Sequence, residues 1–403
     1  MRGSVVVFCV RGVGHLQALL PVVEALVARG LAVHVMTHAD YRAKIDRCGA
    51  RFFDLFGRYP LEAADPTSRP LPSRYVTYAG VYAESLVRDV AALSPALIVY
   101  ETFSVVAPVI ARSLGIPYVN VFANHAPVPS RVIAELECDP RVAISEECWA
   151  AVRRLRDGHG MAKAGPFSYV DGLSPHLNLY AEPEEFLPAE DRAALEPVAF
   201  FGSLAPSLQA AGPVEIFPRD RRAGRILVSF GTVIWTYFAA EACAALSAIS
   251  DASATLDVDV VASLGGHALE ARARDALARR NVEVASYVDQ WSALEAADVF
   301  VTHHGINSTH ESILHQVPMI SYPFFGDQPA LARRCQDLGL AVPVADAPRA
   351  PIAPEAVLSA LDRLRTDRDA FRKRLAEARS WELRTIAARD GVIDRMLALA
   401  EQV

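Results

Sequence analysis

The side chains best suited to chemistry gather in the second half of the chain, where a short apolar run ends and a helical pattern begins. The run ends at Thr302, a glycine turn follows, and the helical pattern starts near Asn307. The first backbone N–H groups of a helix have no partner within the helix, and its positive end attracts anions. His303 and Ser308 add side-chain donors. The spacing therefore predicts a binding site for a diphosphate.

Two further residues could bind a ribose and a base, so the site could hold a whole nucleotide. Glu311 lies one helical turn after Asn307, and its carboxylate can accept hydrogen bonds from ribose hydroxyls. Tyr287 precedes the segment and offers an aromatic face on which a base could stack.

Four histidines, at positions 303, 304, 310 and 315, also suggest a metal site. The segment from His310 to His315 is one residue longer than the H-E-x-x-H motif, and on a helix this spacing turns the two side chains about 140° apart. His303 and His304 are adjacent on an extended segment, so they point to opposite faces. The spacing therefore predicts no metal.

A second candidate site lies near the amino terminus, where the apolar run Val5–Val10 ends and a helical pattern follows. In doubly wound α/β sheets, ligands bind beyond the carboxyl ends of the strands. The turn contains Gly12 and Gly14, but Gln17 stands where dinucleotide-binding turns place a third glycine. The turn therefore disfavours NAD and leaves His15 as the candidate for chemistry.

His15 could act as a general base, because imidazole titrates near neutral pH. Glu101 ends another apolar run, so it could lie along the same sheet edge and orient the imidazole. The other interpretation is that His15 only caps the turn and that Glu101 is a solvated charge at a strand end. The spacing leaves both interpretations open.

Short apolar runs alternate with amphipathic stretches of helix length along the chain, which indicates parallel sheets covered on both faces. The runs that predict strands are Val5–Val10, Ala32–Met36, Leu97–Val99, Tyr118–Phe122, Arg225–Phe230, Val258–Ser263, Val282–Ala285, Val299–Thr302 and Met319–Tyr322. The stretches that predict helices include Leu19–Arg29, Val105–Leu114, Leu269–Arg279 and Ser308–His315.

The alternation restarts near residue 224, after a proline-rich, charged stretch typical of a linker. The sequence therefore predicts an α/β protein with two Rossmann-like domains facing each other across a cleft. The expected domains are 1–210 and 223–380, with a linker at 211–222, and a last helix over 381–403 is expected to cross back onto the first domain. The stretch 124–195 is less regular, which is typical of segments that shape a ligand pocket. The other interpretation is that it forms surface loops with no role in ligand binding.

The second candidate domain resembles the donor-binding signature of family-1 glycosyltransferases, the plant secondary-metabolite and bacterial antibiotic glycosyltransferases with the two-Rossmann GT-B fold. That signature runs W-x-P-Q, x-T-H-x-G-x-x-S-x-x-E, V-P-x-x-x-x-P and D-Q. The matching residues, at matching spacing, are Tyr287-Val288-Asp289-Gln290, Thr302-His303-His304-Gly305-Ile306-Asn307-Ser308-Thr309-His310-Glu311, Val317-Pro318, Pro323 and Asp327-Gln328. Supporting matches are Gly14-His15, Pro95–Glu101 and Ser229-Phe230-Gly231-Thr232.

The resemblance implies a role for each matching residue. Those expected to hold the base and the ribose are Tyr287, Val288, Gln290 and Glu311. Those expected to bind the diphosphate are Thr232, His303, Gly305, Asn307 and Ser308. Asp327 and Gln328 are expected to contact the sugar hydroxyls, and His15, supported by Glu101, is expected to be the general base.

The resemblance also implies the reaction, a direct displacement at the anomeric carbon with inversion. No metal is expected, because the helix end and His303 take up the charge of the leaving group. The expected co-substrate is a UDP- or dTDP-hexose, and Asp327 with Gln328 favours glucose. No other cofactor is implied.

Three departures from the family pattern bear on these expectations. Tyr287 replaces tryptophan, which leaves stacking possible with a smaller ring. Asp289 replaces proline and places a carboxylate near the base, for which we have no explanation. Glu101 stands where aspartate is more usual, so the carboxylate is one methylene further from the backbone.

The acceptor is expected to be a small hydroxylated natural product, an antibiotic or a nucleoside-like molecule, and the sequence does not choose among them. Its pocket is expected to draw on Phe56, Phe122, Asn124, His125, Phe167, Trp235 and Phe238. The alternative function is that of a non-catalytic relative that binds and activates a partner transferase.

The composition limits the classes of protein and the cellular locations that fit this chain. The formal net charge of −7 argues against a general nucleic-acid binder. The six cysteines are scattered without metal-ligand spacing, which favours reduced thiols and a cytoplasmic location, and the alanine- and arginine-rich composition suggests a bacterial source. No run approaches the roughly 18 apolar residues that span a membrane. The protein could form a homodimer, and the sequence does not decide this.

Overall fold

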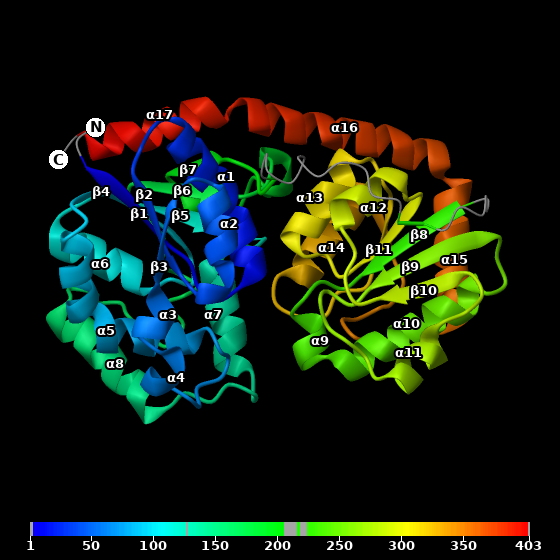
Figure 1. Cartoon of the computed structure of the whole chain (residues 1–403), viewed down its shortest axis with the longest axis horizontal. Helices are drawn as coiled ribbons and strands as arrows, with labels where there is room; N and C mark the ends of the chain where they lie inside the picture. Colours follow the sequence, from blue (N-terminus) through cyan, green and yellow to red (C-terminus); the bar gives the residue numbers. More distant parts are fainter. Residues whose placement is uncertain (1–2, 126–127, 205–215, 218–223, 402–403) are drawn as a thin grey trace. The chain divides into compact units, whose positions relative to one another are not determined.

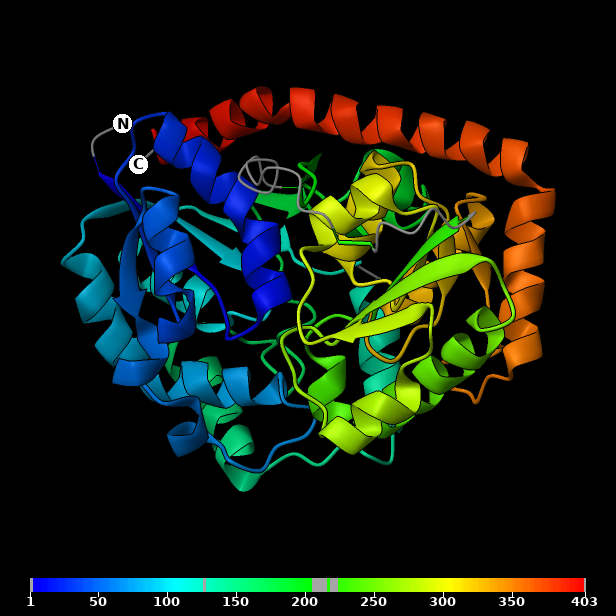
Figure 2. The same ribbon diagram turned by 45° about the vertical axis from the view of Figure 1, so that its right-hand side comes forward.

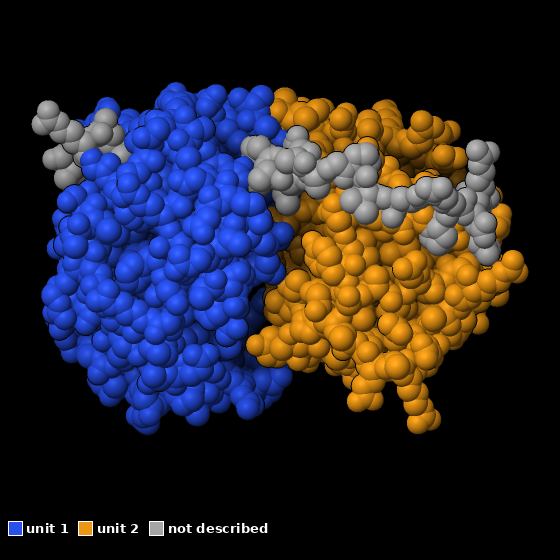
Figure 3. Space-filling model, viewed as in Figure 1, with its two compact units in different colours: residues 1–205, 385–403 blue, residues 206–384 orange. Residues whose placement is uncertain are grey.

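The computed structural model describes residues 3–125, 128–204, 216–217 and 224–401. The chain forms two compact units, coloured separately in Figure 3. Unit 1 comprises Met1–Ala205 and Thr385–Val403, and unit 2 comprises Pro206–Arg384. The linker expected at 211–222 lies outside the described residues except for positions 216 and 217.

Unit 1 is built on a parallel sheet whose strand order is β3-β2-β1-β4-β5-β6-β7 (Figure 1). The strands are β1 Ser4–Phe8, β2 Val33–Thr37, β3 Arg51–Asp54, β4 Pro95–Glu101, β5 Tyr118–Phe122, β6 Leu177–Tyr180 and β7 Val198–Phe200. The central strand β1 is wholly buried, as its uninterrupted apolar sequence predicts. The order of the strands reverses between β1 and β4, which is where such sheets bind ligands.

Helices pack on both faces of this sheet. The longer ones are α1 Val13–Ala28, α5 Ser73–Ala91, α6 Val106–Leu114, α7 Pro129–Cys138, α8 Glu146–Gly158 and α17 Arg389–Ala400, and the shorter ones are α2 Arg42–Arg47, α3 Leu55–Arg58 and α4 Leu61–Ala64. Helix α1 begins six residues before the predicted Leu19, because the polar turn around His15 is itself helical.

The stretch expected to be irregular, 124–195, contains the helices α7 and α8. Their sequences are strongly charged, which hides the apolar stripe. The hydroxyl of Ser145 caps α8 by accepting a hydrogen bond from the Cys148 N–H at 3.0 Å. The sequence interpretation missed these two helices, whereas the segments 159–176 and 181–195 contain only turns and short 3-10 helices, in line with the prediction of a less regular stretch.

Unit 2 repeats the same topology with a parallel sheet of order β10-β9-β8-β11-β12-β13. The strands are β8 Gly224–Ser229, β9 Val258–Ser263, β10 Val282–Ala285, β11 Val299–Thr302, β12 Met319–Ser321 and β13 Ala341–Pro343. The helices are α9 Ile234–Tyr237, α10 Ala239–Ser253, α11 Ala271–Leu277, α12 Gln290–Ala296, α13 Ile306–Leu314, α14 Gln328–Asp337, α15 Pro354–Thr366 and α16 Arg368–Ala387. Its order reverses between β8 and β11, so α13 begins at the corresponding ligand-binding edge.

The carboxyl-terminal segment differs in detail from the helix expected over 381–403. Helix α16 already begins at Arg368, and a break at Ala388 separates it from α17. Helix α17 packs against α1 (Figures 1 and 2), where Arg29 forms ion pairs with Asp390 and Asp394. The end of the chain thus belongs to unit 1.

Candidate active site

His15 and Glu101 meet at the switch point of the unit 1 sheet. His15 lies in the first turn of α1, and Glu101 is the last residue of the neighbouring strand β4. Nδ1 of His15 lies 2.9 Å from Oε2 of Glu101. Because a carboxylate only accepts hydrogen bonds, Nδ1 carries the proton in this pair and Nε2 is left as the basic nitrogen of the neutral ring.

The Glu101 carboxylate is fully buried and is held from three further directions. It accepts hydrogen bonds from the backbone N–H of Val10 at 3.2 Å and of Phe103 at 3.0 Å, and from the hydroxyl of Ser104 at 2.7 Å. The carboxylate is therefore fixed and aimed at His15. The interpretation of Glu101 as a solvated strand-end charge is wrong, because its side chain has no contact with solvent.

Local backbone geometry places the imidazole. A Cβ atom at Gly12 would lie 2.8 Å from Cδ2 of His15, which is closer than real Cβ contacts. A glycine at this position lets the ring lie against the backbone of its own turn. The sequence interpretation noted Gly12 only as part of a dinucleotide pattern and missed this steric role.

Aromatic side chains that the sequence interpretation did not single out surround the pair. The ring of Phe103 lies 4.7 Å from the imidazole of His15, and Tyr169 packs edge-on against Phe103 at 5.3 Å. Phe103 directly follows the Glu101 turn, so its position after the strand end was the available signal. Tyr169 is distant in sequence and gave none.

The predicted acceptor residues of unit 1 occupy two different settings. Phe56 is partly buried and lies 6.5 Å from the ring of His38 and 5.6 Å from that of Tyr78. Phe122 and Phe167 are buried core residues.

Asn124 and His125 follow β5 at the same sheet edge. His125 is buried, and its Nδ1 lies 2.7 Å from Oε1 of the fully buried Glu182. The hydroxyl of Tyr180 lies 3.3 Å from the same nitrogen. Unit 1 therefore contains a further histidine–carboxylate pair with both side chains buried, whose carboxylate the sequence interpretation missed.

In unit 2, His303 occupies a space that two glycines keep open. A Cβ atom at Gly231 would lie 2.7 Å from Nε2 of His303, and one at Gly305 would lie 2.6 Å from the same atom. Burial lowers the pKa of His303 to about 4, so the ring is neutral at pH 7 and can serve as a hydrogen-bond donor without carrying charge.

Helix α13 starts directly after this ring, with Gly305 as its N-cap residue and no side chain capping it. Asn307 and Ser308 lie in its first turn and are almost completely buried. Thr232 follows Gly231 after β8 and is half-buried. The residues expected to bind a diphosphate thus gather at the ends of β8 and β11, the two strands at which the order of the sheet reverses.

The residues expected to bind the ribose contact one another. The amide nitrogen of Gln290 donates to Oε2 of Glu311 at 2.6 Å and to the hydroxyl of Ser308 at 3.0 Å. Burial raises the pKa of Glu311 to about 7. The nearby Asp289, which replaces the family proline, also raises the Glu311 pKa, and its own carboxylate accepts a hydrogen bond from the Ser292 hydroxyl at 2.7 Å.

The remaining donor residues differ in how exposed they are. Tyr287 is 70% exposed, so its ring face is open to a base, whereas Val288 is buried. Asp327 is the N-cap residue of α14. The side-chain oxygen of Gln328 accepts hydrogen bonds from the backbone N–H groups of Phe324 and Phe325, so its amide nitrogen is the group left for a sugar hydroxyl.

His304 has a structural role that the sequence did not indicate. It is fully buried in a left-handed backbone conformation with φ of 59°. Its ring nitrogens lie 3.2 Å from the Thr309 hydroxyl and 2.8 Å from the Ser321 hydroxyl, which locks the turn before α13. Across the described ranges of the chain, no three histidine, cysteine or acidic residues are grouped as metal ligands.

Trp235 and Phe238, the other predicted acceptor residues, belong to unit 2. Trp235 is buried in its core beside Phe230, and Phe238 packs against Phe324 and Phe325 with the guanidinium of Arg349 over its ring. Both residues follow the loop after β8, in α9 and at its carboxyl-terminal end.

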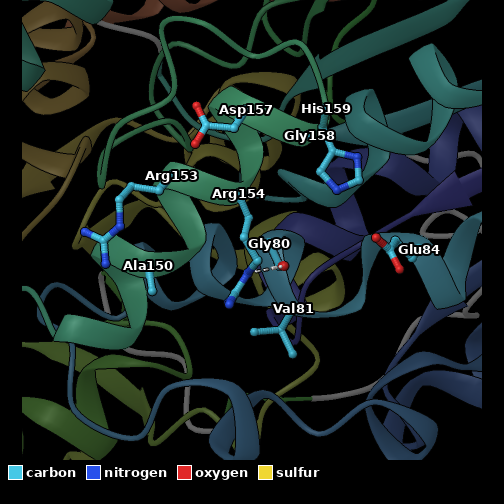
Figure 4. Close-up of a pocket in the computed structure, with 9 residues that line it drawn as sticks. All are labelled: Gly80, Val81, Glu84, Ala150, Arg153, Arg154, Asp157, Gly158 and His159. Carbon is cyan, nitrogen blue, oxygen red and sulfur yellow. Dashed lines mark hydrogen bonds between the residues drawn. The ribbon is translucent and has the colours of Figure 1, made fainter.

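A hollow of about 900 Å³ lies between α5 and α8 of unit 1 (Figure 4). It is lined by charged side chains such as Arg153 and Glu84, and Arg154 closes part of it by donating to the Gly80 carbonyl at 2.9 Å. None of the predicted site residues lines this hollow. All six cysteines are free thiols, and none of the described helices is long and apolar enough to cross a membrane.

Comparison with known proteins shows which family the chain resembles. Residues 215–370 match the family described as UDP-glucoronosyl and UDP-glucosyl transferase. The uncharacterized UDP-glucosyltransferase YdhE of Bacillus subtilis is 25% identical over 341 residues, which cover 81% of each chain. The oleandomycin glycosyltransferase of Streptomyces antibioticus is 25% identical over 361 residues, covering 84% of this chain and 78% of the relative.

Solved structures share the fold over the whole length. The glycosyltransferase of kitacinnamycin has a TM-score of 0.77 at 24% identity, covering 98% of this chain and 100% of its own. The calicheamicin glycosyltransferase CalG4 has a TM-score of 0.74 at 22% identity, covering 99% and 100%. The predicted fold of two Rossmann-like domains and the predicted family resemblance are both confirmed.

Proposed function

Since the chain resembles the family-1 glycosyltransferases of natural products, we propose that it is an inverting, metal-independent glycosyltransferase. It transfers a hexose from a UDP- or dTDP-sugar to a hydroxyl of a small natural product, an antibiotic or a nucleoside-like acceptor. The preferred hexose in this proposal is glucose. The observation that carries this proposal is the His15–Glu101 pair, whose imidazole is oriented by a fully buried carboxylate. A protein that only bound nucleotides would not need it.

In this proposal the acceptor hydroxyl gives its proton to Nε2 of His15 as its oxygen attacks the anomeric carbon. Glu101 stabilises the imidazolium that forms, because its oxygen accepts the hydrogen bond from Nδ1 at 2.9 Å. The bond from the anomeric carbon to the diphosphate oxygen breaks in the same displacement. Attack from the face opposite the leaving group inverts the anomeric configuration.

The leaving nucleoside diphosphate carries the electron pair of the broken bond. The backbone N–H groups in the first turn of α13, together with the side chains of Asn307, Ser308 and the neutral His303, supply the donors that stabilise this charge. Gln290 and Glu311 hold the ribose, and Tyr287 stacks on the base. These donors are the basis for proposing that no metal is needed.

The preference for glucose rests on Asp327 and on the amide nitrogen of Gln328, which suit a fully hydroxylated hexose. The similarity to YdhE, which is named a UDP-glucosyltransferase, supports this choice. The oleandomycin, kitacinnamycin and calicheamicin enzymes support a role in secondary metabolism, including antibiotic biosynthesis. The free cysteines support a cytoplasmic location.

The test is release of UDP or dTDP by the purified protein, measured with UDP-glucose and dTDP-glucose across a panel of hydroxylated acceptors. Product NMR establishes whether the anomeric configuration is inverted. His15→Ala is expected to lower turnover by about 10²- to 10⁴-fold, the usual contribution of a general base, while UDP binding is retained. His159→Ala, a histidine of unit 1 outside the predicted site, is the matched control and is expected to leave turnover unchanged.

Two results would contradict the proposal. If His15→Ala kept full activity with every working acceptor, the catalytic role of the pair would be wrong. If the wild type bound UDP but released none with any acceptor and worked only in the presence of another transferase, the protein would be an auxiliary partner.

A further inference from the structure

Helix α13 is unusual because it is buried although most of its residues are polar. Every residue from Ile306 to Ile313 is buried, and six consecutive ones, from Asn307 to Ser312, are polar or charged. Hydrogen bonds fix both the distance and the direction between the groups that they join. The position of α13 in unit 2 therefore depends on its polar contacts.

One of these contacts is a buried pair between His310 and Glu382 of α16. Nδ1 of His310 lies 2.5 Å from Oε1 of Glu382, and the two side chains are 0% and 1% exposed. Consecutive helix residues point about 100° apart, so His310 points away from the face that carries Glu311. The pair holds α13 from a side that faces no proposed ligand.

A second contact lies one turn away on both helices. Nε of Arg379 donates to the carbonyl of Leu314, the last residue of α13, at 2.9 Å. Arg379 and Glu382 lie three positions apart on α16, and His310 and Leu314 lie four positions apart on α13, so each pair shares a helix face. Two adjacent hydrogen bonds fix both the translation and the rotation of α13 against α16.

The contact also lies close to the end of unit 2 in the chain. Glu382 precedes Thr385, the residue at which α16 passes into unit 1, by three positions. Within unit 1, Arg389 donates to the carbonyls of Phe201 and Gly202 at 2.7 Å and 3.2 Å. In the chain, α16 is thus followed, after the break at Ala388, by a residue that is hydrogen-bonded within unit 1.

We propose that His310 and Glu382 are positioning residues for the nucleotide-sugar site, acting through the placement of α13 on α16. This inference rests on the proposed function and deepens it. Asn307, Ser308 and Glu311 lie on one rigid helix, so a small shift of α13 moves all three donor contacts together. The pair touches no substrate, and its effect is therefore on donor binding.

The test compares Glu382→Gln with the wild type by calorimetric titration with UDP and by steady-state kinetics. Glutamine keeps the size of the side chain but weakens the hydrogen bond to His310. We expect the Kd for UDP and the KM for the sugar donor to rise by roughly 2- to 30-fold, the range for changes transmitted through packing. The kcat and the acceptor KM are expected to stay within about twofold of the wild type.

The matched control is Glu377→Gln on the same helix, where the glutamate is exposed and forms an ion pair with Arg374. This variant is expected to bind UDP like the wild type. A second variant, His310→Phe with Glu382→Leu, replaces the buried pair by apolar side chains, a change that is often neutral or stabilising for folding. We expect it to unfold at the wild-type temperature or above and still to bind UDP more weakly.

Three results would overturn the inference. The first is an unchanged UDP Kd in Glu382→Gln. The second is a fall in kcat and a rise in the acceptor KM of Glu382→Gln that are as large as its change in donor KM. The third is wild-type UDP binding by the apolar double variant. The last result would mean that the pair only stabilises the fold. Failure of the proposed function shows differently, in the wild type itself: binding of neither UDP nor dTDP would remove the nucleotide site and this inference with it, whereas UDP binding without turnover would refute catalysis and leave the UDP Kd comparison valid.

Discussion

The glycines that flank His303 allow the placement of this ring to be tested by adding single methyl groups. At Gly231 the backbone has φ of +72°, and a Cβ atom would lie 2.7 Å from Nε2 of His303. Alanine at 231 therefore meets both backbone strain, about 1–2 kcal/mol for a left-handed conformation, and a steric clash. The ring cannot move away simply, because Gly305 borders the same atom.

Two further glycines separate strain from clash. At Gly305 the backbone has an ordinary φ of −65°, so alanine adds only the clash at 2.6 Å. At Gly266 the backbone has φ of +92° and a Cβ atom would meet nothing within 4 Å, so alanine adds only strain. Gly305→Ala should displace His303 and remove a hydrogen bond to a charged diphosphate, worth about 1.5–3 kcal/mol. That loss corresponds to a UDP affinity lower by about 10- to 150-fold.

Thermal unfolding and UDP calorimetry on the three variants give a distinct pattern. Gly266→Ala is expected to lower Tm by roughly 2–8 °C for its 1–2 kcal/mol of strain and to keep UDP binding. Gly305→Ala should lose UDP binding with less effect on Tm, and Gly231→Ala should lose both. Wild-type UDP binding by Gly305→Ala would refute the placement of His303 at the diphosphate.

Three further predictions concern the carboxylates and the first turn of α1. Glu101→Gln places an amide donor among N–H and O–H donors, so it should cost about 1–3 kcal/mol of stability and lower turnover, measured by thermal unfolding and UDP release. Gly12→Ala should push the His15 ring away from Glu101 and lower kcat without changing the UDP Kd, because the clash lies in unit 1. Glu311 has its pKa raised to about 7 from the usual 4.5, so its folded form keeps a proton that the unfolded chain releases. The protonated carboxyl contributes fully to stability below pH 4.5, and this contribution is lost as pH rises toward 7. Glu311→Gln should therefore be more stable than the wild type at pH 8, by on the order of 3 kcal/mol at most. At pH 5 the difference in stability between the two proteins should be smaller. Equal stability differences at the two pH values in urea unfolding would contradict the burial of this carboxylate.

The central strands could be predicted from the sequence because their physical cause is local. Tyr118–Phe122 and Val258–Ser263 are strands with the predicted bounds, since buried parallel strands have uninterrupted apolar sequences. The edge strands β3 and β13 were not predicted. One contains Arg51 and Asp54, and the other ends in Pro343, which are residues that an edge position tolerates.

The candidate site divides in the same way. Residues set by a strand end or a helix start, such as His15 and Asn307, were predictable from position along the chain. Contacts between distant segments were not, which is why the burial of Glu101 and the pair of His310 with Glu382 emerge only in three dimensions. A sequence motif likewise does not indicate that the side-chain oxygen of Gln328 already accepts a hydrogen bond from the backbone of its own loop.

The polar interior of α13 bears on how a new donor preference could arise. A substitution within this helix changes both a ligand contact and the packing of unit 2, since its residues are buried on every side. The loops beside it are under less constraint, because Tyr287 and Phe325 are 70% and 37% exposed. Variation in the base or sugar that the protein accepts should therefore be accessible through these loops. The sequence and the position of helix α13 would stay unchanged in such variants.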